Sequence, residues 1–386
     1  MKNIAIFGST GSIGRNTLSV IRRFPDKFKA VALSVDSDIK TLYLQVKEFR
    51  PFFVCIRNKE AAFRLKKVLG HKINIYSGDE GLLEFAKDKR INQCVFAISG
   101  SAALRPLLSA IKSGKNIALA NKEALVMAGP LIMRMAGKSK IKIVPVDSEQ
   151  SAIWQCLQGQ DRSRLKTIYL TASGGPLLNA KDAALRRVSV LRVLKHPRWK
   201  MGRKITVDSA TLMNKGLEFL EAMFLFNVNR KMIKILIHPE ALVHSMVEFV
   251  DGVILAQLSK TDMRVPIQYA LSYPDRLDNA SSGIDFYKLK ALNFSKPDCL
   301  KFPCLSLAYQ AARELGTLPA VMNAANELAV GEFLDARIKF TAIPEIVAKV
   351  MRKHKNTLNP DLSDICKADI WARQEARRFI QDRRLM

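Results

Sequence analysis

Over its first 150 residues, the chain alternates short apolar runs with longer stretches in which apolar residues recur every three or four positions. The short runs are typical of buried strands, and the periodic stretches are typical of amphipathic helices. The predicted strands are Ile4–Phe7, Val31–Val35, Phe53–Ile56, Ile73–Tyr76, Cys94–Ile98, Ile117–Leu119 and Ile141–Val146. The predicted helices between them include Ile13–Arg23, Leu42–Phe49 and Ala61–Leu69. This order of elements predicts an α/β fold built on a doubly wound parallel sheet.

The pattern changes from about Ser151 onward. A short helix is followed by strands of a more antiparallel sheet, predicted at Thr167–Thr171, Ile233–Ile237, Val243–Val250 and Val253–Leu258. Asp251-Gly252 between the last two strands predicts a tight hairpin. A polar stretch then leads to a mostly helical pattern from Pro303. We therefore predict a dinucleotide-binding domain (1–147), a central α+β catalytic and dimerisation domain (148–280), a linker (281–302) and a C-terminal helical domain (303–386).

Composition narrows the class of protein. A chain of 386 residues is long enough for two or three domains, and 48% hydrophobic with 25% charged residues is typical of a globular protein. No apolar run approaches the ~18 residues that span a bilayer, and the first apolar run is too short for a signal peptide. The six cysteines form no CxxC pair, which favours reduced core thiols. We predict a cytoplasmic protein with no membrane partner.

The formal net charge of +27 raises the possibility of a nucleic-acid binder. The basic residues are spread along the chain, however, and no zinc-finger, basic-zipper or RNA-binding aromatic motif is present. A basic protein also attracts phosphorylated small molecules. We predict no nucleic-acid partner, and strongly salt-dependent binding to duplex or single strands would be the observation against it.

Three glycines follow the first predicted strand and open a helix, in the sequence Gly8-Ser9-Thr10-Gly11-Ser12-Ile13-Gly14. Glycine lets the backbone approach a pyrophosphate, and the helix N-terminus supplies N–H groups to it. This context favours a Rossmann-like dinucleotide site over a plain strand-to-helix turn. The acidic Asp36-Ser37-Asp38 after the second strand favours NAD, or a 2′-phosphate held by another residue such as Lys40.

Two carboxylates, Asp147 and Glu149, follow the last apolar run of the sheet. If the chain stays extended, residues i and i+2 face the same side, so both could bind one divalent cation such as Mg²⁺ or Mn²⁺. Alone, such a pair is more often a solvated turn that leads into a helix, with Asp or Ser as the N-cap.

Four further segments carry chemical groups: Asn121-Lys122-Glu123, Thr171–Pro176, His196–Gly202 and Asp208–Glu218. The second is a glycine-rich turn with hydroxyls that suits a phosphate, and the third has the composition of a mobile flap. In the fourth, Asn214, Lys215 and Glu218 fall on one helical face. Each segment alone also fits an ordinary turn, loop or surface ion pair.

Together, however, these segments resemble the 1-deoxy-D-xylulose 5-phosphate reductoisomerase family. The resemblance covers nearly the whole chain, from Ile4 to about Ile346. The matching segments are Gly8–Gly14, Ala120–Leu125, Val146–Ser151, Thr171–Pro176, His196–Gly202, Asn214–Glu218 and Asn323–Glu327.

The resemblance implies an NADPH-dependent and metal-dependent enzyme, with roles for individual residues. It implies a metal site made by Asp147, Glu149 and Glu218. It implies contacts to the substrate phosphate from Ser173, Ser209, Asn214 and Lys215, and to the rest of the substrate from Lys122, Ser148 and His196, with Trp199 and Met201 in the flap. It implies NADPH contacts from Gly8, Thr10, Gly11, Ser12, Ile13, Asn121, Lys122, Glu123 and Gly202. The catalytic set would be Lys122, Asp147, Glu149, His196 and Glu218.

The implied reaction rearranges 1-deoxy-D-xylulose 5-phosphate and reduces it to 2-C-methyl-D-erythritol 4-phosphate, a step toward isoprenoid precursors. The resemblance also implies a homodimer. Members of the family often carry a basic or amide element where this chain has Asp36-Ser37-Asp38. A related dehydrogenase that acts on another phosphorylated or acidic substrate is the alternative, and a metal requirement would separate the two.

Overall fold

The computed structural model describes residues 1–70, 73–199, 201–278 and 283–384. The chain divides into two compact units, and the division falls within two helices. The first unit comprises Met1–Asn121, Ile132–Ser151 and Asp262–Ser282, and the second comprises Lys122–Leu131, Ala152–Thr261 and Gly283–Met386. The predicted boundary between residues 280 and 281 lies outside the described residues, and the division into three domains and a linker stays a prediction.

The first unit is built on a seven-stranded sheet in the order β4-β3-β2-β1-β5-β6-β7, with every pairing parallel. Its strands are β1 (Lys2–Phe7), β2 (Phe28–Val35), β3 (Phe53–Ile56), β4 (Asn74–Ser77), β5 (Gln93–Phe96), β6 (Asn116–Leu119) and β7 (Ile143–Pro145). The predicted doubly wound sheet is confirmed. The order reverses between β1 and β5, the position where such sheets bind ligands.

Helices of the first unit connect and cover these strands. They are α1 (Ser12–Arg23), α2 (Ile39–Phe49), α3 (Lys59–Leu69), α4 (Gly78–Lys87), α5 (Leu104–Lys112), the second half of α6 (Lys122–Lys138) and α12 (Arg264–Ser272). The residues Ile4 to Phe7 of β1 are fully buried, as expected for a parallel strand covered on both faces. Although α12 lies far along the chain, it packs on α1, β6 and β7, and the Lys2 Nζ donates to the Leu271 carbonyl at 2.7 Å.

The second unit contains a four-stranded sheet in the order β11-β10-β8-β9. Its strands are β8 (Leu165–Ala172), β9 (Ile233–Ile237), β10 (Val243–Phe249) and β11 (Ile254–Leu258). Strand β10 pairs antiparallel with β8 and β11, as predicted, whereas β9 runs parallel to β8. The predicted hairpin is present, with Gly252 at a φ of +85° between β10 and β11.

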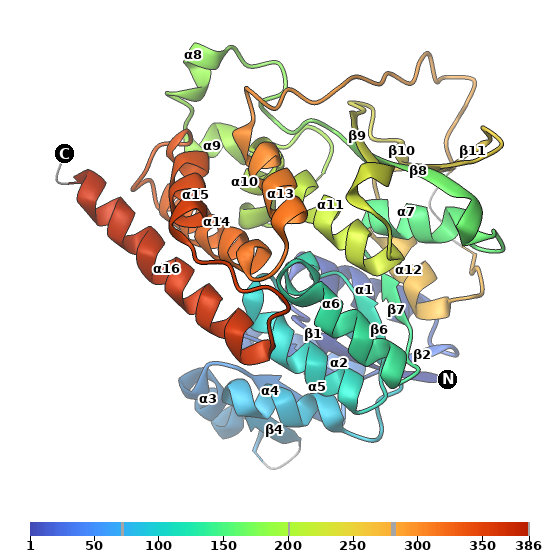
Figure 1. Ribbon diagram of the computed structural model, residues 1–386. Coiled ribbons are helices and arrows are strands. Elements are labelled where there is room, and N and C mark those ends of the chain that lie inside the picture. Colours follow the sequence, from blue (N-terminus) through green and yellow to red (C-terminus); the bar gives the residue numbers. More distant parts are fainter. Residues whose placement is uncertain (71–72, 200, 279–282, 385–386) are drawn as a thin grey trace. The chain divides into compact units, whose positions relative to one another are not determined.

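Helices make up the rest of the second unit (Figure 1). They are the first half of α6, most of α7 (Ser148–Cys156), α8 (Asp182–Leu185), α9 (Val190–Val193), α10 (Arg203–Ala210), α11 (Met213–Phe226), α13 (Pro303–Glu314), α14 (Leu318–Leu334), α15 (Ala342–Lys353) and α16 (Leu362–Arg384). Helices α14, α15 and α16 pack side by side, and α13 packs on both α11 and α14. The helical C-terminal region is therefore confirmed.

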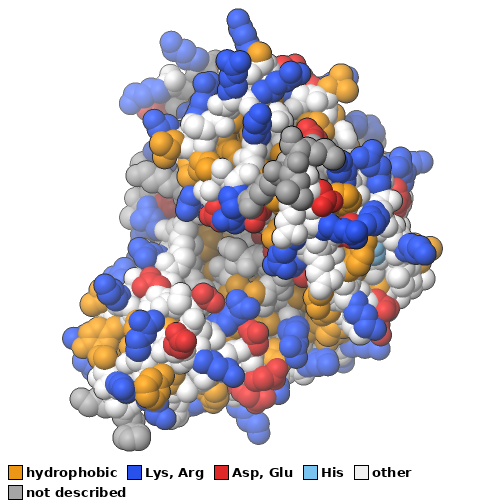
Figure 2. Space-filling model, turned by 90° about the vertical axis from the view of Figure 1, so that its left-hand side faces the viewer, with side chains coloured by type: hydrophobic (Ala, Val, Ile, Leu, Met, Phe, Trp, Pro, Cys, Tyr) orange, Lys and Arg blue, Asp and Glu red, His pale blue; other side chains and the backbone are white. Residues whose placement is uncertain are grey.

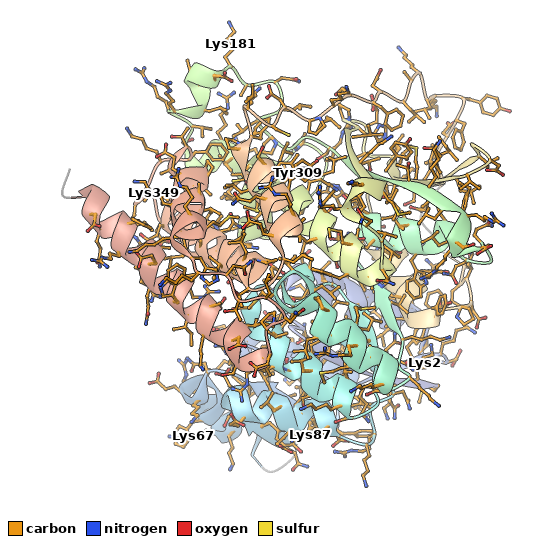
Figure 3. The ribbon with its side chains drawn as sticks, viewed as in Figure 1. Lys2, Lys67, Lys87, Lys181, Tyr309 and Lys349 are labelled. Atoms are coloured by element: carbon orange, nitrogen blue, oxygen red, sulfur yellow. The ribbon has the colours of Figure 1, made fainter. Side chains whose placement is uncertain are left out.

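The cysteines and charges behave as ordinary core and surface groups. All six cysteines are free, and burial raises the pKa of the Cys55, Cys94 and Cys304 thiols to about 12. Figure 2 shows Lys and Arg side chains spread over the face that it draws, with Asp and Glu among them. The labelled Lys67 and Lys181 point away from the ribbon (Figure 3). Within the described residues, no helix combines the length and apolar character needed to cross a bilayer.

Candidate active site

The glycine loop between β1 and α1 leaves no room for side chains at two positions. Gly8 has a φ of +91°, and a Cβ on it would lie 2.9 Å from the Ala97 carbonyl oxygen. A Cβ on Gly14 would lie only 2.2 Å from the Gly8 oxygen. Glycine is required at both positions, because the loop folds tightly against itself and against the residues after β5.

The same loop leaves an open helix N-terminus. Gly11 is the N-cap of α1 and provides no side-chain cap, and both Gly11 and Ser12 are exposed. Behind them, Ser9 is buried and exchanges hydrogen bonds with Gln45 of α2, at 2.7 and 2.9 Å. A loop fixed from behind, with accessible N–H groups in front, can hold a pyrophosphate.

Charged groups gather where β2 and β3 end. Asp36 follows β2, and its side chain is 69% exposed. Arg57 follows β3, and its Nη1 lies 3.5 Å from Asp36 Oδ1. The Arg57 Nε also donates to Asp79 Oδ1 at 2.7 Å. Asp38 caps α2 by accepting from the Thr41 N–H, while Lys40 is exposed. Asp36 and Lys40 were predicted from the sequence, whereas Arg57 was not, because only the pairing of β2 with β3 brings it to Asp36.

Asn121 lies at the end of β6 and is buried. Its Nδ2 donates to the carbonyls of Ile98 and Gly100, at 2.8 and 3.0 Å. The side chain therefore fixes the loop that follows β5, on the other side of the switch point from the glycine loop. Asn121 positions the predicted cofactor site through this loop.

The extended geometry considered for Asp147 and Glu149 is wrong, and the alternative, a turn that leads into a helix, is what forms. The two side chains still offer ligand oxygens within 4.8 Å of each other, as the metal-site prediction requires. Strand β7 ends at Pro145 and α7 begins at Ser148, so Glu149 lies in the first turn of a helix. A helix forms here because Ser148 and Glu149 are both favoured in a first turn, where a carboxylate interacts well with the helix dipole. The Ser148 Oγ donates to Glu149 Oε2 at 2.5 Å. Both carboxylates lie in the first unit and are half-buried, while Glu218 belongs to the second.

Glu218 is the centre of a buried charged cluster in the second unit. Its Oε1 accepts from the Lys122 Nζ at 2.9 Å and from the Asn214 Nδ2 at 2.5 Å. Its Oε2 accepts from the Lys215 Nζ, and Lys122 also donates to Asn214 at 2.9 Å. The side chains of Lys122, Lys215 and Glu218 are at most 5% exposed. The ammonium groups of Lys122 and Lys215 can attract an anionic ligand.

The sequence predicted that Asn214, Lys215 and Glu218 share a helical face, and both contacts to Glu218 confirm this. The predicted single helix start is instead two helices, α10 and α11, separated at Leu212, whose φ is +59°. Because of this break, α11 begins as a separate helix at Met213. Lys122 reaches the same carboxylate from the first turn of α6.

A second charged cluster surrounds Lys204, whose side chain is 23% exposed and which was not among the predicted site residues. Its Nζ lies 2.8 Å from Glu123 Oε1 and 2.8 Å from Asp208 Oδ2. Asn326 of α14 donates to the other oxygen of Asp208 at 2.8 Å. Burial alone would lower the pKa of Lys204, but Asp208 and Glu123 outweigh it and raise the pKa. The predicted cofactor residue Glu123 therefore also joins α6 to α10.

The glycine-rich turn after β8 packs against the end of α10. Gly175 has a φ of +71°, and a Cβ on it would lie 2.5 Å from the Ser209 carbonyl oxygen. The structure therefore brings the Ser173 turn beside the Ser209 backbone. Ser173 Oγ also lies 3.1 Å from His196 Nε2 and accepts from the Gly175 N–H at 3.4 Å.

His196 opens the segment predicted as a flap. Its Nδ1 accepts from the N–H groups of Arg198 and Trp199, at 3.2 and 2.9 Å. Burial lowers the pKa of His196 to about 4, so the ring is neutral at pH 7. Because Nδ1 is an acceptor, we assign the proton to Nε2, where it faces Ser173.

The rest of the flap segment is partly held by neighbouring strands. The Arg198 Nε donates to the Pro239 carbonyl at 2.9 Å, and the Trp199 ring centroid lies 6.1 Å from that of His244. Met201 is half-buried, and Gly202 is the exposed N-cap of α10. Residue 200 lies outside the described residues.

Family models for 1-deoxy-D-xylulose 5-phosphate reductoisomerase match three successive stretches of the chain. The first covers residues 4–129, and models of the C-terminal domains cover 143–226 and 258–375. The curated 1-deoxy-D-xylulose 5-phosphate reductoisomerase of Caldanaerobacter subterraneus is 49% identical over 98% of this chain and 99% of its own length. The chain belongs to the 1-deoxy-D-xylulose 5-phosphate reductoisomerase family.

Other reductoisomerases are similar to this chain in sequence and in structure. That of Heliobacterium modesticaldum is 51% identical, with 97% of each chain covered. A solved DOX-P reductoisomerase in complex with NADPH, fosmidomycin and magnesium superposes with a TM-score of 0.93, at 39% identity over 99% of this chain and 98% of that one. The reductoisomerase from Zymomonas mobilis in complex with NADPH gives 0.91 at 38% identity, with 98% and 99% covered. The resemblance identified from the sequence is confirmed.

Proposed function

We propose that this chain converts 1-deoxy-D-xylulose 5-phosphate to 2-C-methyl-D-erythritol 4-phosphate, using NADPH and Mg²⁺ or Mn²⁺. The observation that carries this proposal is the buried cluster of Lys122, Asn214, Lys215 and Glu218, in a chain that belongs to the reductoisomerase family. Solved relatives contain NADPH and magnesium. A cluster that combines two ammonium groups with a carboxylate suits a phosphorylated substrate bound beside a cation.

The residues fit both of the groups that the family uses. Gly8 and Gly14 let the loop fold tightly, because a Cβ on either would clash with the protein's own backbone. The exposed Gly11 and Ser12 at its uncapped helix N-terminus suit the pyrophosphate of NADPH. Asp147, Glu149 and Glu218 offer carboxylate oxygens, the ligand type that Mg²⁺ and Mn²⁺ prefer. When bound, NADPH supplies a hydride, and the cation stabilises negative charge on substrate oxygens.

Residues of the second unit would bind and orient the substrate. Ser173, Ser209, Asn214 and Lys215 would hold its phosphate, with Lys215 supplying the positive charge. The neutral His196 can donate a hydrogen bond from Nε2 to a substrate oxygen. Trp199 and Met201 would cover the substrate and exclude water, which protects a reactive aldehyde.

The direct test follows nicotinamide absorbance when purified protein is given 1-deoxy-D-xylulose 5-phosphate, NADPH and Mn²⁺. We expect NADPH oxidation that stops when the metal is chelated and resumes when it is restored. Product identity is checked by NMR, because a simple dehydrogenase would leave the carbon skeleton unbranched. No oxidation of either NADPH or NADH with this substrate would overturn the proposal.

We also propose that the protein works as a homodimer in the cytoplasm. The β10–β11 hairpin supports pairing, because β11 is an edge strand and Val250, Val253 and Ile254 are 49–60% exposed. Exposed apolar side chains on a sheet edge favour association. Sedimentation analysis of the wild type and of Ile254→Lys tests this: a dimer that the substitution dissociates is expected, and a monomeric wild type would contradict it.

A further inference from the structure

The ends of β2 and β3 are fixed side by side in the first unit. Val35 pairs with Ile56 in the sheet. The Arg57 N–H donates to the Val35 carbonyl at 3.0 Å, and the Asn58 N–H donates to the Asp36 backbone carbonyl at 2.9 Å. Arg57 and Asp36 therefore extend from neighbouring strand ends. Their side chains meet, with Nη1 and Oδ1 separated by 3.5 Å.

This position decides between two nicotinamide cofactors. In a sheet with a glycine loop after β1, the adenosine ribose lies beyond the end of β2. An acidic residue there accepts a hydrogen bond from the ribose 2′-hydroxyl of NADH and repels the 2′-phosphate of NADPH. Asp36 is such a residue and is 69% exposed. By itself, Asp36 would therefore select NADH, against the cofactor of the solved relatives.

We propose that Arg57 sets the preference of this chain for NADPH, by pairing with Asp36 and binding the 2′-phosphate from the end of β3. This inference rests on the proposed NADPH-dependent function. The guanidinium has five N–H donors and a fixed charge. Asp79 accepts from Nε at 2.7 Å and Asp36 lies 3.5 Å from Nη1, which orients the group with Nη2 as the terminal nitrogen offered to a phosphate. The side chain is 45% exposed and therefore accessible to a ligand.

Lys40 is the competing candidate that the sequence suggested. It is exposed in the first turn of α2, and among the described residues no ion pair holds its side chain. A lysine on a flexible stem loses more conformational entropy when it binds than an arginine that is already oriented. Arg57 is therefore the better placed of the two cations.

The test measures dissociation constants of NADPH and NADH by fluorescence titration, without substrate. We expect Arg57→Ala to weaken NADPH binding about tenfold or more, or about 1.4 kcal/mol, and to change NADH binding less than about twofold. Arg64→Ala is the matched control, because Arg64 is an exposed arginine of the same unit with no ion pair among the described residues. Thermal unfolding of each variant confirms that it is folded.

A double-mutant cycle sharpens the result. We expect Asp36→Asn to strengthen NADPH binding and weaken NADH binding, and to strengthen NADPH binding less in the Arg57→Ala background. Equal loss of both cofactors in Arg57→Ala, a selective loss in Lys40→Ala instead, or a wild type that prefers NADH would each overturn the proposal. Nucleotide binding needs no turnover. The binding constants can therefore be measured even if the proposed reaction does not occur, and the two failures can be told apart.

Discussion

The two units place their functional groups in opposite physical settings. In the first unit, the glycine loop works through backbone shape, and the charged groups near it, Asp36 and Arg57, are 69% and 45% exposed. In the second unit, Lys122, Lys215 and Glu218 are almost completely buried. Exposed charges are screened by water and contribute little to stability, whereas buried charges depend strongly on their partners. We therefore expect substitutions in the buried Glu218 cluster to affect stability and activity together, and substitutions of Asp36 and Arg57 to affect mainly cofactor binding.

The largest effect is expected from Glu218→Gln. The substitution leaves the ammonium groups of Lys122 and Lys215 buried without their carboxylate, which costs about 3–5 kcal/mol of unfolding free energy. Activity should fall at least about a hundredfold, because a proposed metal ligand is lost. Urea unfolding and steady-state kinetics measure both, with the exposed Glu60→Gln as the control. A stable and active Glu218→Gln protein would contradict the expected difference between the buried charges of the second unit and the exposed charges of the first.

A smaller effect, confined to the first unit, is expected from Gly14→Ala. Its Cβ would lie 2.2 Å from the Gly8 oxygen, so the loop must move, at a cost of about 1–3 kcal/mol. NADPH affinity should fall in parallel. Gly137→Ala is the control, because Gly137 lies in the same unit, is not a predicted cofactor contact, and a Cβ on it would meet no atom within 4 Å. Calorimetric titration that finds equal NADPH affinity in both variants would show that loop shape does not decide binding.

The third prediction concerns pH. The folded protein holds the pKa of His196 at about 4, below the unfolded value of about 6.5. Between these values the unfolded chain binds more protons than the folded one, so stability should rise with pH from about 4 to 6.5. Urea unfolding across this range should show a shallower rise for His196→Gln than for the wild type. Identical slopes would place His196 in a solvated environment.

The smallest effect is expected at the exposed ion pair of the first unit, Arg22 and Glu48, which meet at 2.5 Å. Their side chains are 56% and 46% exposed. Arg22→Ala should cost under about 1 kcal/mol, and the loss should shrink further in high salt. Thermal unfolding at two salt concentrations measures this, and a loss as large as that of Glu218→Gln would contradict the comparison.

The sequence predicted the first unit well, because its features are local. Buried parallel strands appear as continuous apolar runs, and the required glycines at Gly8 and Gly14 are visible from their spacing. The strand Ile141–Val146 does not continue through Asp147 and Glu149, because the first-turn preferences of Ser148 and Glu149 favoured the alternative, a turn into a helix. The family resemblance supplied the functional roles that spacing alone left open.

Contacts between distant segments could not be predicted. Nothing near Arg57 in the sequence indicates that it meets Asp36, since only the pairing of β2 with β3 brings them together. Lys204 and Asp208 lie four residues apart on α10, yet the third member, Glu123, comes from α6. An i, i+4 pair of this kind is usually a solvated surface pair, and only the fold reveals that Asp208 is buried and that Lys204 is only 23% exposed.

The two ion pairs of Lys204, whose side chain is 23% exposed, also make it a reporter of chemical reactivity. Acylating reagents attack the neutral amine, and Lys204 has both a raised pKa and carboxylates on either side. It should react far more slowly than the exposed Lys67. The rate at which Lys204 is labelled would then measure how often α6 and α10 separate, and would report local opening of the second unit.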